Sequence, residues 1–127
     1  CATLTGAARV AVGAEIAALF CNDSDTAEAL LKAGEQEDDP LWQLPLHNPY
    51  RSMLDSKVAD LNNISNAPYG GSITAALFLR EFVQKQTPWI HIDFMAYNTR
   101  SQPGRPEGGE AMGMRALFAM LQEKFKG

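Results

Sequence analysis

The sequence predicts an α/β protein with helices on both sides of a sheet. Apolar runs of strand length alternate along the chain with segments of helical period, the order expected for this fold class. The chain has 127 residues, of which 46% are hydrophobic and 20% charged, values typical of one globular domain. The sequence contains no internal repeat and no low-complexity segment.

The first 21 residues contain the elements that begin this alternation. Residues 1–4 have the composition of a short buried strand, and residues 6–12 predict a short helix that ends at Gly13. Residues 16–21 are continuously apolar. Continuous rather than alternating apolarity is typical of a strand covered on both faces.

A helix is expected next, after the turn-forming run at residues 22–25. Asp25 and Glu28 have the spacing of a capping box, and Gly34 predicts the end of the helix. The acidic residues 35–40 predict a solvated loop.

The middle of the chain is less regular. Residues 41–46 predict a short strand, and Pro45 restricts it to an edge of the sheet or an irregular segment. A short helix is expected over residues 48–54, followed by extended or loop structure over 57–64.

The second half predicts two helices and one strand. Ser72 is the expected N-cap of a buried helix over 73–83. Residues 89–97 predict the central strand, with Ile90, Ile92 and Phe94 packed against helices. A loop rich in Pro, Gly and Arg follows at 99–109. The last helix is expected over residues 110–125, with an apolar core face: Met114, Leu117, Phe118, Leu121 and Phe125.

Charge and hydropathy argue against several classes of function. The net charge is −4, so we expect neither a nucleic-acid-binding surface nor attraction to anionic membranes. The longest nearly uninterrupted apolar run, residues 73–79, is far shorter than the roughly 20 residues that span a bilayer. Two cysteines are too few for a disulfide framework, which favours a reduced, cytoplasmic setting.

Chemically active residue types are sparse. His91 and Asp93 share one strand face, where they form either part of a metal site or a hydrogen-bonded polar pair in the core. His47 is expected to be a surface or packing residue. Gly6 and the Gly70-Gly71-Ser72 run each precede a predicted helix, where backbone N–H groups can bind an anion, although one or two glycines are a weak signal.

Four stretches in order resemble the leucyl aminopeptidase family of cytosolic metallopeptidases. They are Ala-Thr-Leu-Thr-Gly-Ala at 2–7, Ser-Lys-Val-Ala-Asp-Leu-Asn-Asn at 56–63, the Gly-Ser-Ile-Thr run at 71–79, and His-Ile-Asp at 91–93. The resemblance implies that residues 1–127 are the C-terminal portion of an aminopeptidase catalytic domain. The implied fold is a fragment of a three-layer α/β/α sandwich with a mostly parallel central sheet.

The implied activity is removal of N-terminal residues from peptides by an enzyme with two divalent metal ions, Mn or Zn. The family assembles as cytoplasmic hexamers. Its metal ligands include carboxylates in an Asn-Thr-Asp-Ala-Glu-Gly-Arg motif upstream of the Ala-Thr-Leu-Thr-Gly strand, and this chain lacks that motif. Because the chain also opens within a predicted strand, we expect a fragment that binds no metal alone and contains no catalytic residue.

The resemblance implies that this chain forms one wall of the active site. Its substrate-binding residues would be Thr3, Leu4, Thr5, Gly6, Met95 and Asn98. Backbone groups of Leu4 and Gly6 would face the bound peptide, and Met95 and Asn98 would form the specificity pocket. Ordinary core packing is an alternative for Met95. A non-enzymatic α/β interaction module derived from the same fold is the alternative function.

Overall fold

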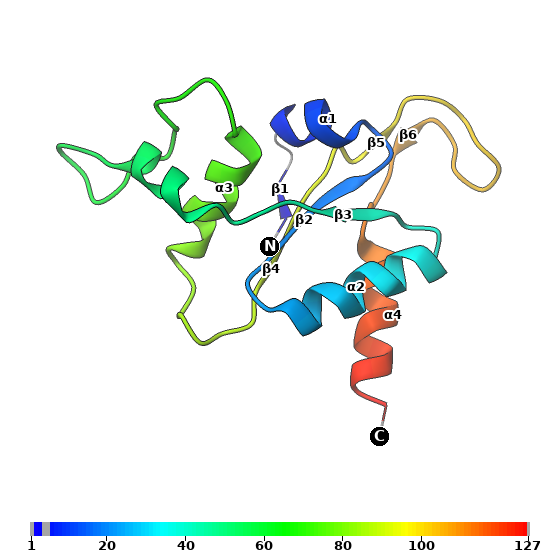
Figure 1. Cartoon of the computed structure of the whole chain (residues 1–127). Helices are drawn as coiled ribbons and strands as arrows, with labels where there is room; N and C mark the ends of the chain where they lie inside the picture. Colours follow the sequence, from blue (N-terminus) through cyan, green and yellow to red (C-terminus); the bar gives the residue numbers. More distant parts are fainter. Residues whose placement is uncertain (1, 4–5, 127) are drawn as a thin grey trace.

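A four-stranded sheet forms the centre of the molecule in the computed structural model, which describes residues 2–3 and 6–126 (Figure 1). Its strand order is β1 (Ala2–Thr3), β4 (Ile90–Asp93), β2 (Ala17–Cys21) and β3 (Leu41–Gln43). β1 pairs with β4 and β2 with β3 in parallel, whereas β2 and β4 are antiparallel. The predicted α/β class and mostly parallel sheet are confirmed.

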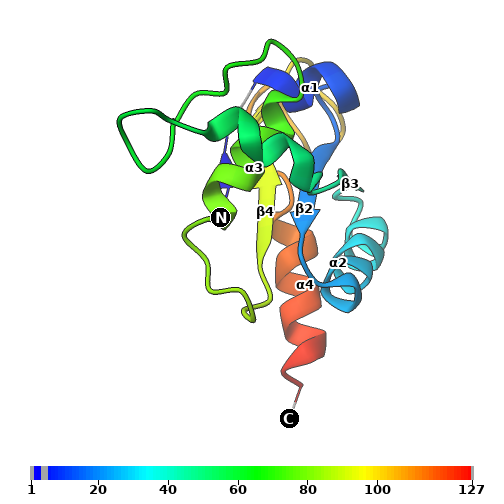
Figure 2. The same ribbon diagram turned by 60° about the vertical axis from the view of Figure 1, so that its left-hand side comes forward.

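Helices pack on both faces of the sheet (Figures 1 and 2). Leu19 of β2 belongs to one hydrophobic cluster, with residues of α2 (Ser24–Gln36) and α4 (Met114–Lys124). Phe20, the next residue, belongs to a second cluster, with residues of α1 (Gly6–Val12) and α3 (Gly71–Arg80). Because successive strand residues point to opposite faces, β2 contributes to both clusters and is buried along its whole length, as its apolar run predicted.

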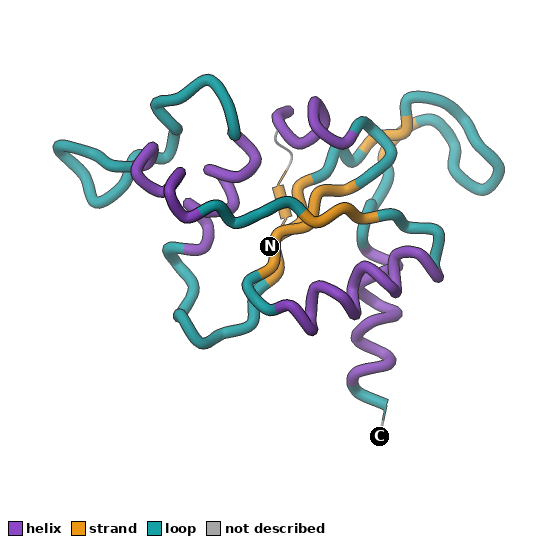
Figure 3. The backbone as a smooth tube through the Cα atoms, viewed as in Figure 1, coloured by secondary structure: helices purple, strands orange, loops and turns teal. Residues whose placement is uncertain are grey.

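Several predicted elements are confirmed with small changes in bounds. Helix α1 ends at the predicted Gly13, which has a φ of 81° and donates its N–H to the carbonyl of Arg9. β3 is an edge strand, as expected for a segment followed by Pro45. The helix predicted at 48–54 is a 3₁₀ helix, η1 (Asn48–Leu54), and a long loop leads from it to α3 (Figure 3).

Both predicted features of α2 are wrong in detail. Its N-cap is Asp23, not Asp25, and the Asp23 carboxylate accepts a hydrogen bond of 2.9 Å from the N–H of Thr26. Gly34 lies inside the helix instead of ending it. A Cβ at Gly34 would lie 2.8 Å from the carbonyl oxygen of Asp39, so glycine permits close passage of the following loop.

The start of α3 also differs from the prediction. Gly70, with a φ of 70°, is the residue before the helix, and Ser72 lies within the first turn instead of capping it. The hydroxyl of Ser72 instead donates a hydrogen bond of 2.8 Å to Asp93 in the sheet. This bond connects the first turn of α3 to β4.

The predicted nine-residue strand at 89–97 is wrong, because β4 ends at Asp93. Ala96 has a φ of 57°, which a regular strand does not accept, and the chain turns there. It continues as β5 (Tyr97–Asn98), which pairs with β6 (Gly108–Gly109) in a separate antiparallel hairpin. Part of the predicted 99–109 loop is therefore a hairpin, and Phe94 lies beyond the central strand and is only partly buried.

The last helix begins at Met114, four residues later than predicted, and its predicted core face is also wrong. Phe118 and Phe125 are 63% and 72% exposed, and Met114 and Leu121 are exposed too. The helix packs mainly against α2, and Ala116 and Met120 are its buried residues in the core cluster, with Leu117 partly buried. Small residues were not expected to form the contact face.

Candidate functional site

The parallel pairing of β1 with β4 brings together two segments singled out from the sequence. Thr3 lies beside Asp93, and the carbonyl of Thr3 accepts a hydrogen bond of 3.1 Å from the N–H of Phe94. Both strands end at this edge of the sheet, where parallel strands commonly present binding groups. Leu4 and Thr5, two predicted substrate-binding residues, lie outside the described residues.

A buried polar cluster lies behind this edge. The ring of His91 is fully buried between Phe20 and Trp89, with ring centroids 5.7 Å and 5.9 Å away. Its Nε2 lies 3.1 Å from the hydroxyl oxygen of Thr3. Asp93 is also fully buried and accepts the hydrogen bond from Ser72. The two polar residues of β4 therefore join β1 and α3 to the sheet.

Burial also determines the charge state of His91. Loss of hydration lowers the pKa of the imidazole from 6.5 to about 4, and the nearby carboxylate of Asp93 only partly opposes this effect. The ring is therefore neutral at pH 7. This environment agrees with the polar-pair interpretation of His91 and Asp93, and the hydrogen-bond partners recorded for them come from strand β1 and helix α3.

The described residues do not fit a metal centre. Within residues 2–3 and 6–126, no three side chains of His, Cys, Asp or Glu are grouped so that they could share an ion. His91 and Asp93 are two residues with partners inside the core, short of the three or four ligands a metal site needs. His47, at the surface, contacts the ring of Tyr50 edge-on at 4.7 Å.

Gly6 is the first residue of α1 and the last residue of the segment predicted to bind the peptide backbone. It is exposed, and a Cβ built on it would meet no described atom within 4 Å. Its neighbour Ala7 packs closely on α3, because a Cβ at Gly71 would lie 3.1 Å from the Cβ of Ala7. The starts of α1 and α3 therefore lie side by side, leaving Gly6 open to solvent.

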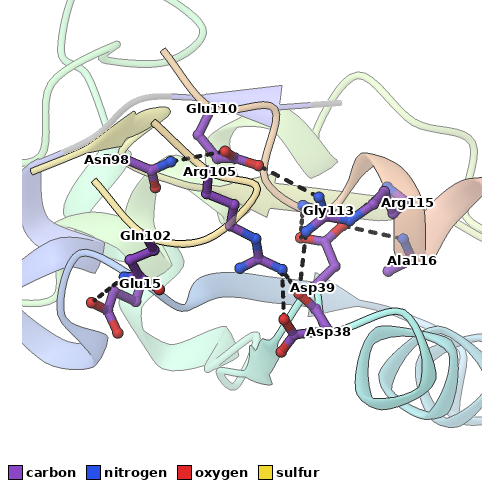
Figure 4. A network of polar contacts seen from close by, with 10 residues as sticks. All are labelled: Glu15, Asp38, Asp39, Asn98, Gln102, Arg105, Glu110, Gly113, Arg115 and Ala116. Atoms are coloured by element: carbon purple, nitrogen blue, oxygen red, sulfur yellow. Dashed lines mark hydrogen bonds and ion pairs between the residues drawn. The ribbon is translucent and has the colours of Figure 1, made fainter. Parts of the chain in front are cut away.

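The two predicted pocket residues have different surroundings. Met95 is partly buried and packs against the cluster formed by α2, α4 and one face of the sheet, which supports some role in core packing. Asn98 lies in β5, and its Nδ2 donates hydrogen bonds of 3.2 Å to the carbonyl of Pro106 and 2.9 Å to Glu110 (Figure 4). No contact joins Met95 to Asn98 among those recorded for the described residues.

Glu110 is a residue that the sequence interpretation missed. Its Oε2 accepts the bond from Asn98, and its Oε1 lies 3.8 Å from an Arg115 guanidinium nitrogen. Its side chain is only 18% exposed. No local pattern signalled it, because residues 99–107 separate the two strands whose pairing brings Glu110 to Asn98.

The acidic loop before β3 is also more than a solvated segment. Asp39 is buried, and its carboxylate accepts hydrogen bonds from the backbone N–H groups of Gly113, Arg115 and Ala116 (Figure 4). It therefore caps α4 from a distant part of the chain, and the predicted solvated loop is wrong for this residue. Asp38, beside it, is exposed and pairs with Arg105 at 2.9 Å.

A groove lies between α2 and the end of α4, and no predicted site residue lines it. Candidate binding groups are concentrated instead at the edge where β1 and β4 end. There the structure brings Thr3 beside the start of the segment that leads to Met95 and Asn98. No helix in the described residues has the length and apolarity needed to cross a membrane.

Known proteins resemble this chain in sequence and in fold. Residues 1–118 match the model of the cytosol aminopeptidase family, catalytic domain. A probable cytosol aminopeptidase of Rickettsia bellii (strain OSU 85-389) is 38% identical over 98% of this chain and 26% of its own length. One from Prochlorococcus marinus (strain MIT 9313) is 48% identical over 91% of this chain and 24% of its own.

The fold agrees as well. The crystal structure of the cytosol aminopeptidase from Coxiella burnetii superposes with a TM-score of 0.91 and 53% sequence identity, over 98% of this chain and 27% of that one. The chain thus spans about a quarter of the length of the relatives it matches. With a family match that covers nearly the whole chain and a fold that agrees, the chain belongs to the cytosol aminopeptidase family and corresponds to part of its catalytic domain.

Proposed function

We propose that this chain forms a substrate-binding wall of an aminopeptidase that removes N-terminal residues from peptides. Residues 1–127 would be the C-terminal portion of its catalytic domain. The observation that carries the proposal is the parallel pairing of β1 with β4. It supports a single binding edge made by Thr3, the exposed start of α1 and the segment through Met95 and Asn98.

In this proposal, the backbone of the Thr3–Gly6 segment aligns the peptide, and two side chains contact its first residue. Open space at Gly6 is suited to close approach of a peptide backbone. Met95 is flexible and polarizable, so it adapts to side chains such as Leu or Met. A difference of one methylene in such a pocket is worth about 1–3 kcal/mol, so selectivity for the first residue should be graded.

The divalent ions implied by the family, Mn or Zn, would be bound by residues outside this chain, since its described residues do not fit a metal centre. The isolated chain would therefore be inactive. The complete enzyme would be a cytoplasmic homohexamer acting on peptides. The first test is hydrolysis of leucine p-nitroanilide by the purified 127-residue chain, with and without Mn or Zn. Metal-dependent turnover, with contaminating peptidases excluded, would contradict the proposal that the metal ligands lie outside this chain.

The second test concerns the pocket in the full-length enzyme. Met95→Ala should change the ratio of kcat/KM for Leu over Ala substrates and leave the metal content unchanged. Met114→Ala is the matched control, because Met114 lies exposed on α4. An unchanged ratio together with loss of metal would show that Met95 has been assigned to the wrong part of the site. The interaction-module alternative predicts no peptidase activity even for the full-length protein.

A further inference from the structure

The hairpin after β4 fixes the side-chain amide of Asn98 in one orientation. Asn98 pairs with Gly108, and Ala96 accepts a hydrogen bond from the N–H of Glu110. Asn98 and Glu110 are therefore diagonal neighbours on one face of the two-stranded ribbon, within reach of each other's side chains. Figure 4 shows the Glu110 carboxylate between the Asn98 amide and Arg115.

Both groups beside the Asn98 nitrogen are acceptors. Pro106 offers a backbone carbonyl at 3.2 Å, and Glu110 offers a carboxylate oxygen at 2.9 Å. A carbonyl and a carboxylate cannot donate, so the amide must direct its NH₂ group toward them. In the opposite orientation, the Asn98 oxygen would face two oxygens with no hydrogen between them.

The oxygen Oδ1 of Asn98 is then the group left for a ligand. Among the described residues, no hydrogen bond to this oxygen is recorded, and Asn98 is only partly buried. Glu110 itself is held in place, because its other carboxylate oxygen lies 3.8 Å from Arg115. An acceptor of fixed orientation thus belongs to a residue that the proposed function assigns to the specificity pocket.

We propose that Glu110 is a positioning residue that orients the Asn98 amide, so that the specificity pocket presents a hydrogen-bond acceptor in addition to the apolar Met95. This inference rests on the proposed function. The pocket would accept apolar first residues and those that donate a hydrogen bond. It would discriminate against first residues whose side chains only accept, because two acceptors would then face each other without water.

Methionine and methionine sulfoxide are suitable probes, since they have similar shapes and the sulfoxide adds only an acceptor. In the full-length enzyme, the ratio of kcat/KM for methionine over methionine sulfoxide p-nitroanilide should be high. Glu110→Ala should lower this ratio about three- to tenfold, the value of one hydrogen bond, because the amide is then freer to turn its NH₂ group to the pocket. Turnover of the methionine substrate should change much less. An unchanged ratio would overturn the inference.

Glu107→Gln is the matched control, because Glu107 lies exposed in the same hairpin and should leave the ratio unchanged. If Glu110→Ala does not fold, as judged by circular dichroism, Glu110→Met replaces it with a side chain of similar length. Its thioether is at most a weak acceptor, so the Asn98 amide loses its charged partner and the ratio should fall in the same direction. An unchanged ratio in folded Glu110→Met would likewise overturn the inference.

Asn98→Leu separates this inference from the proposed function. It should change the ratio itself, and adding Glu110→Ala to it should then have no further effect, because the amide to be oriented is gone. If Asn98→Leu changes the ratio and Glu110→Ala does not, the pocket assignment stands and the role of Glu110 is refuted. If Asn98→Leu leaves the ratio unchanged, Asn98 does not line the pocket, and both the inference and that part of the proposed function fail.

Discussion

Acidification should destabilise this protein through His91. The folded protein keeps the imidazole neutral because burial lowers its pKa to about 4, whereas the unfolded chain takes up a proton near the ordinary value of 6.5. The unfolded state therefore binds more protons between these two values. The contribution of His91 to stability is complete above about pH 6.5 and is lost as the pH falls toward about 4.

The size of the effect follows from the gap between the two pKa values. It corresponds to about 3 kcal/mol in total, of which about 2 kcal/mol should be lost between about pH 7.5 and about pH 5. Urea unfolding at these two pH values, followed by the fluorescence of Trp89 stacked on the ring, measures the loss. His91→Gln, which has no charge to gain, should lose about 2 kcal/mol less than the wild type over the same interval.

Carboxylates remote from His91 affect the wild type and the variant equally, so their contribution cancels in the comparison. His47→Gln, at the exposed histidine, is the control and should behave as the wild type does. Parallel loss of stability in the wild type and His91→Gln would refute the reasoning. It would mean that water or a rearranged Asp93 stabilises the charged ring inside the fold.

Three further substitutions test the packing and the binding edge. Asp39→Ala should lower the free energy of unfolding by at least about 2 kcal/mol, because backbone N–H groups of α4 lose a buried acceptor. Asp38→Ala is the control, and it should lower the free energy of unfolding by under about 1 kcal/mol in the same urea titration. Phe94→Ala should cost about 1–2 kcal/mol instead of the about 3–5 kcal/mol of a fully buried aromatic residue, and no measurable loss would contradict its packing against the core. In the full-length enzyme, Gly6→Val should lower kcat/KM for substrates with any first residue. The Tm should change little, since a Cβ at this position meets open space. Normal turnover would show that the peptide does not approach this residue.

Local pattern was sufficient for the elements whose partners are close in sequence or whose burial is uniform. The apolar run at 16–21 predicted β2 because a strand between two helical layers needs apolar side chains in both directions. It failed where distant segments determine conformation. Nothing in the alternation at 89–97 reveals that Ala96 takes a positive φ, and the hairpin that imposes this turn includes Gly108, far along the chain.

The last helix shows a second limit of prediction from the hydrophobic pattern. Its large apolar residues predicted a core face, yet Phe118 is exposed, and Ala116 is buried beside Gly34 of α2. Helix α4 approaches closely enough that a Cβ on Gly113 would lie 3.1 Å from Ile92, so small residues fill the contact. Hydrophobic spacing alone does not show whether the large or the small apolar residues of a helix face the core.

The candidate site was predictable only in part. Resemblance to the family supplied Met95 and Asn98, which composition and spacing could not have selected. Glu110 was missed because its role depends on a cross-hairpin contact between residues 12 positions apart. His91 and Asp93 were recognised as polar residues on one strand face, but their partners became evident only from the arrangement of β1 and α3 around β4.

The cap supplied by Asp39 has a consequence for how the protein opens. The amides at the start of α4 cannot exchange with solvent while the carboxylate of Asp39, 74 to 77 residues earlier, holds them. Opening of the turn between α2 and β3 would leave the first turn of α4 without an acceptor, and unwinding of α4 would leave a buried carboxylate alone. Each of these segments therefore raises the free-energy cost of opening the other. Hydrogen exchange should report them as a single cooperative unit, although the chain separates them by more than half its length.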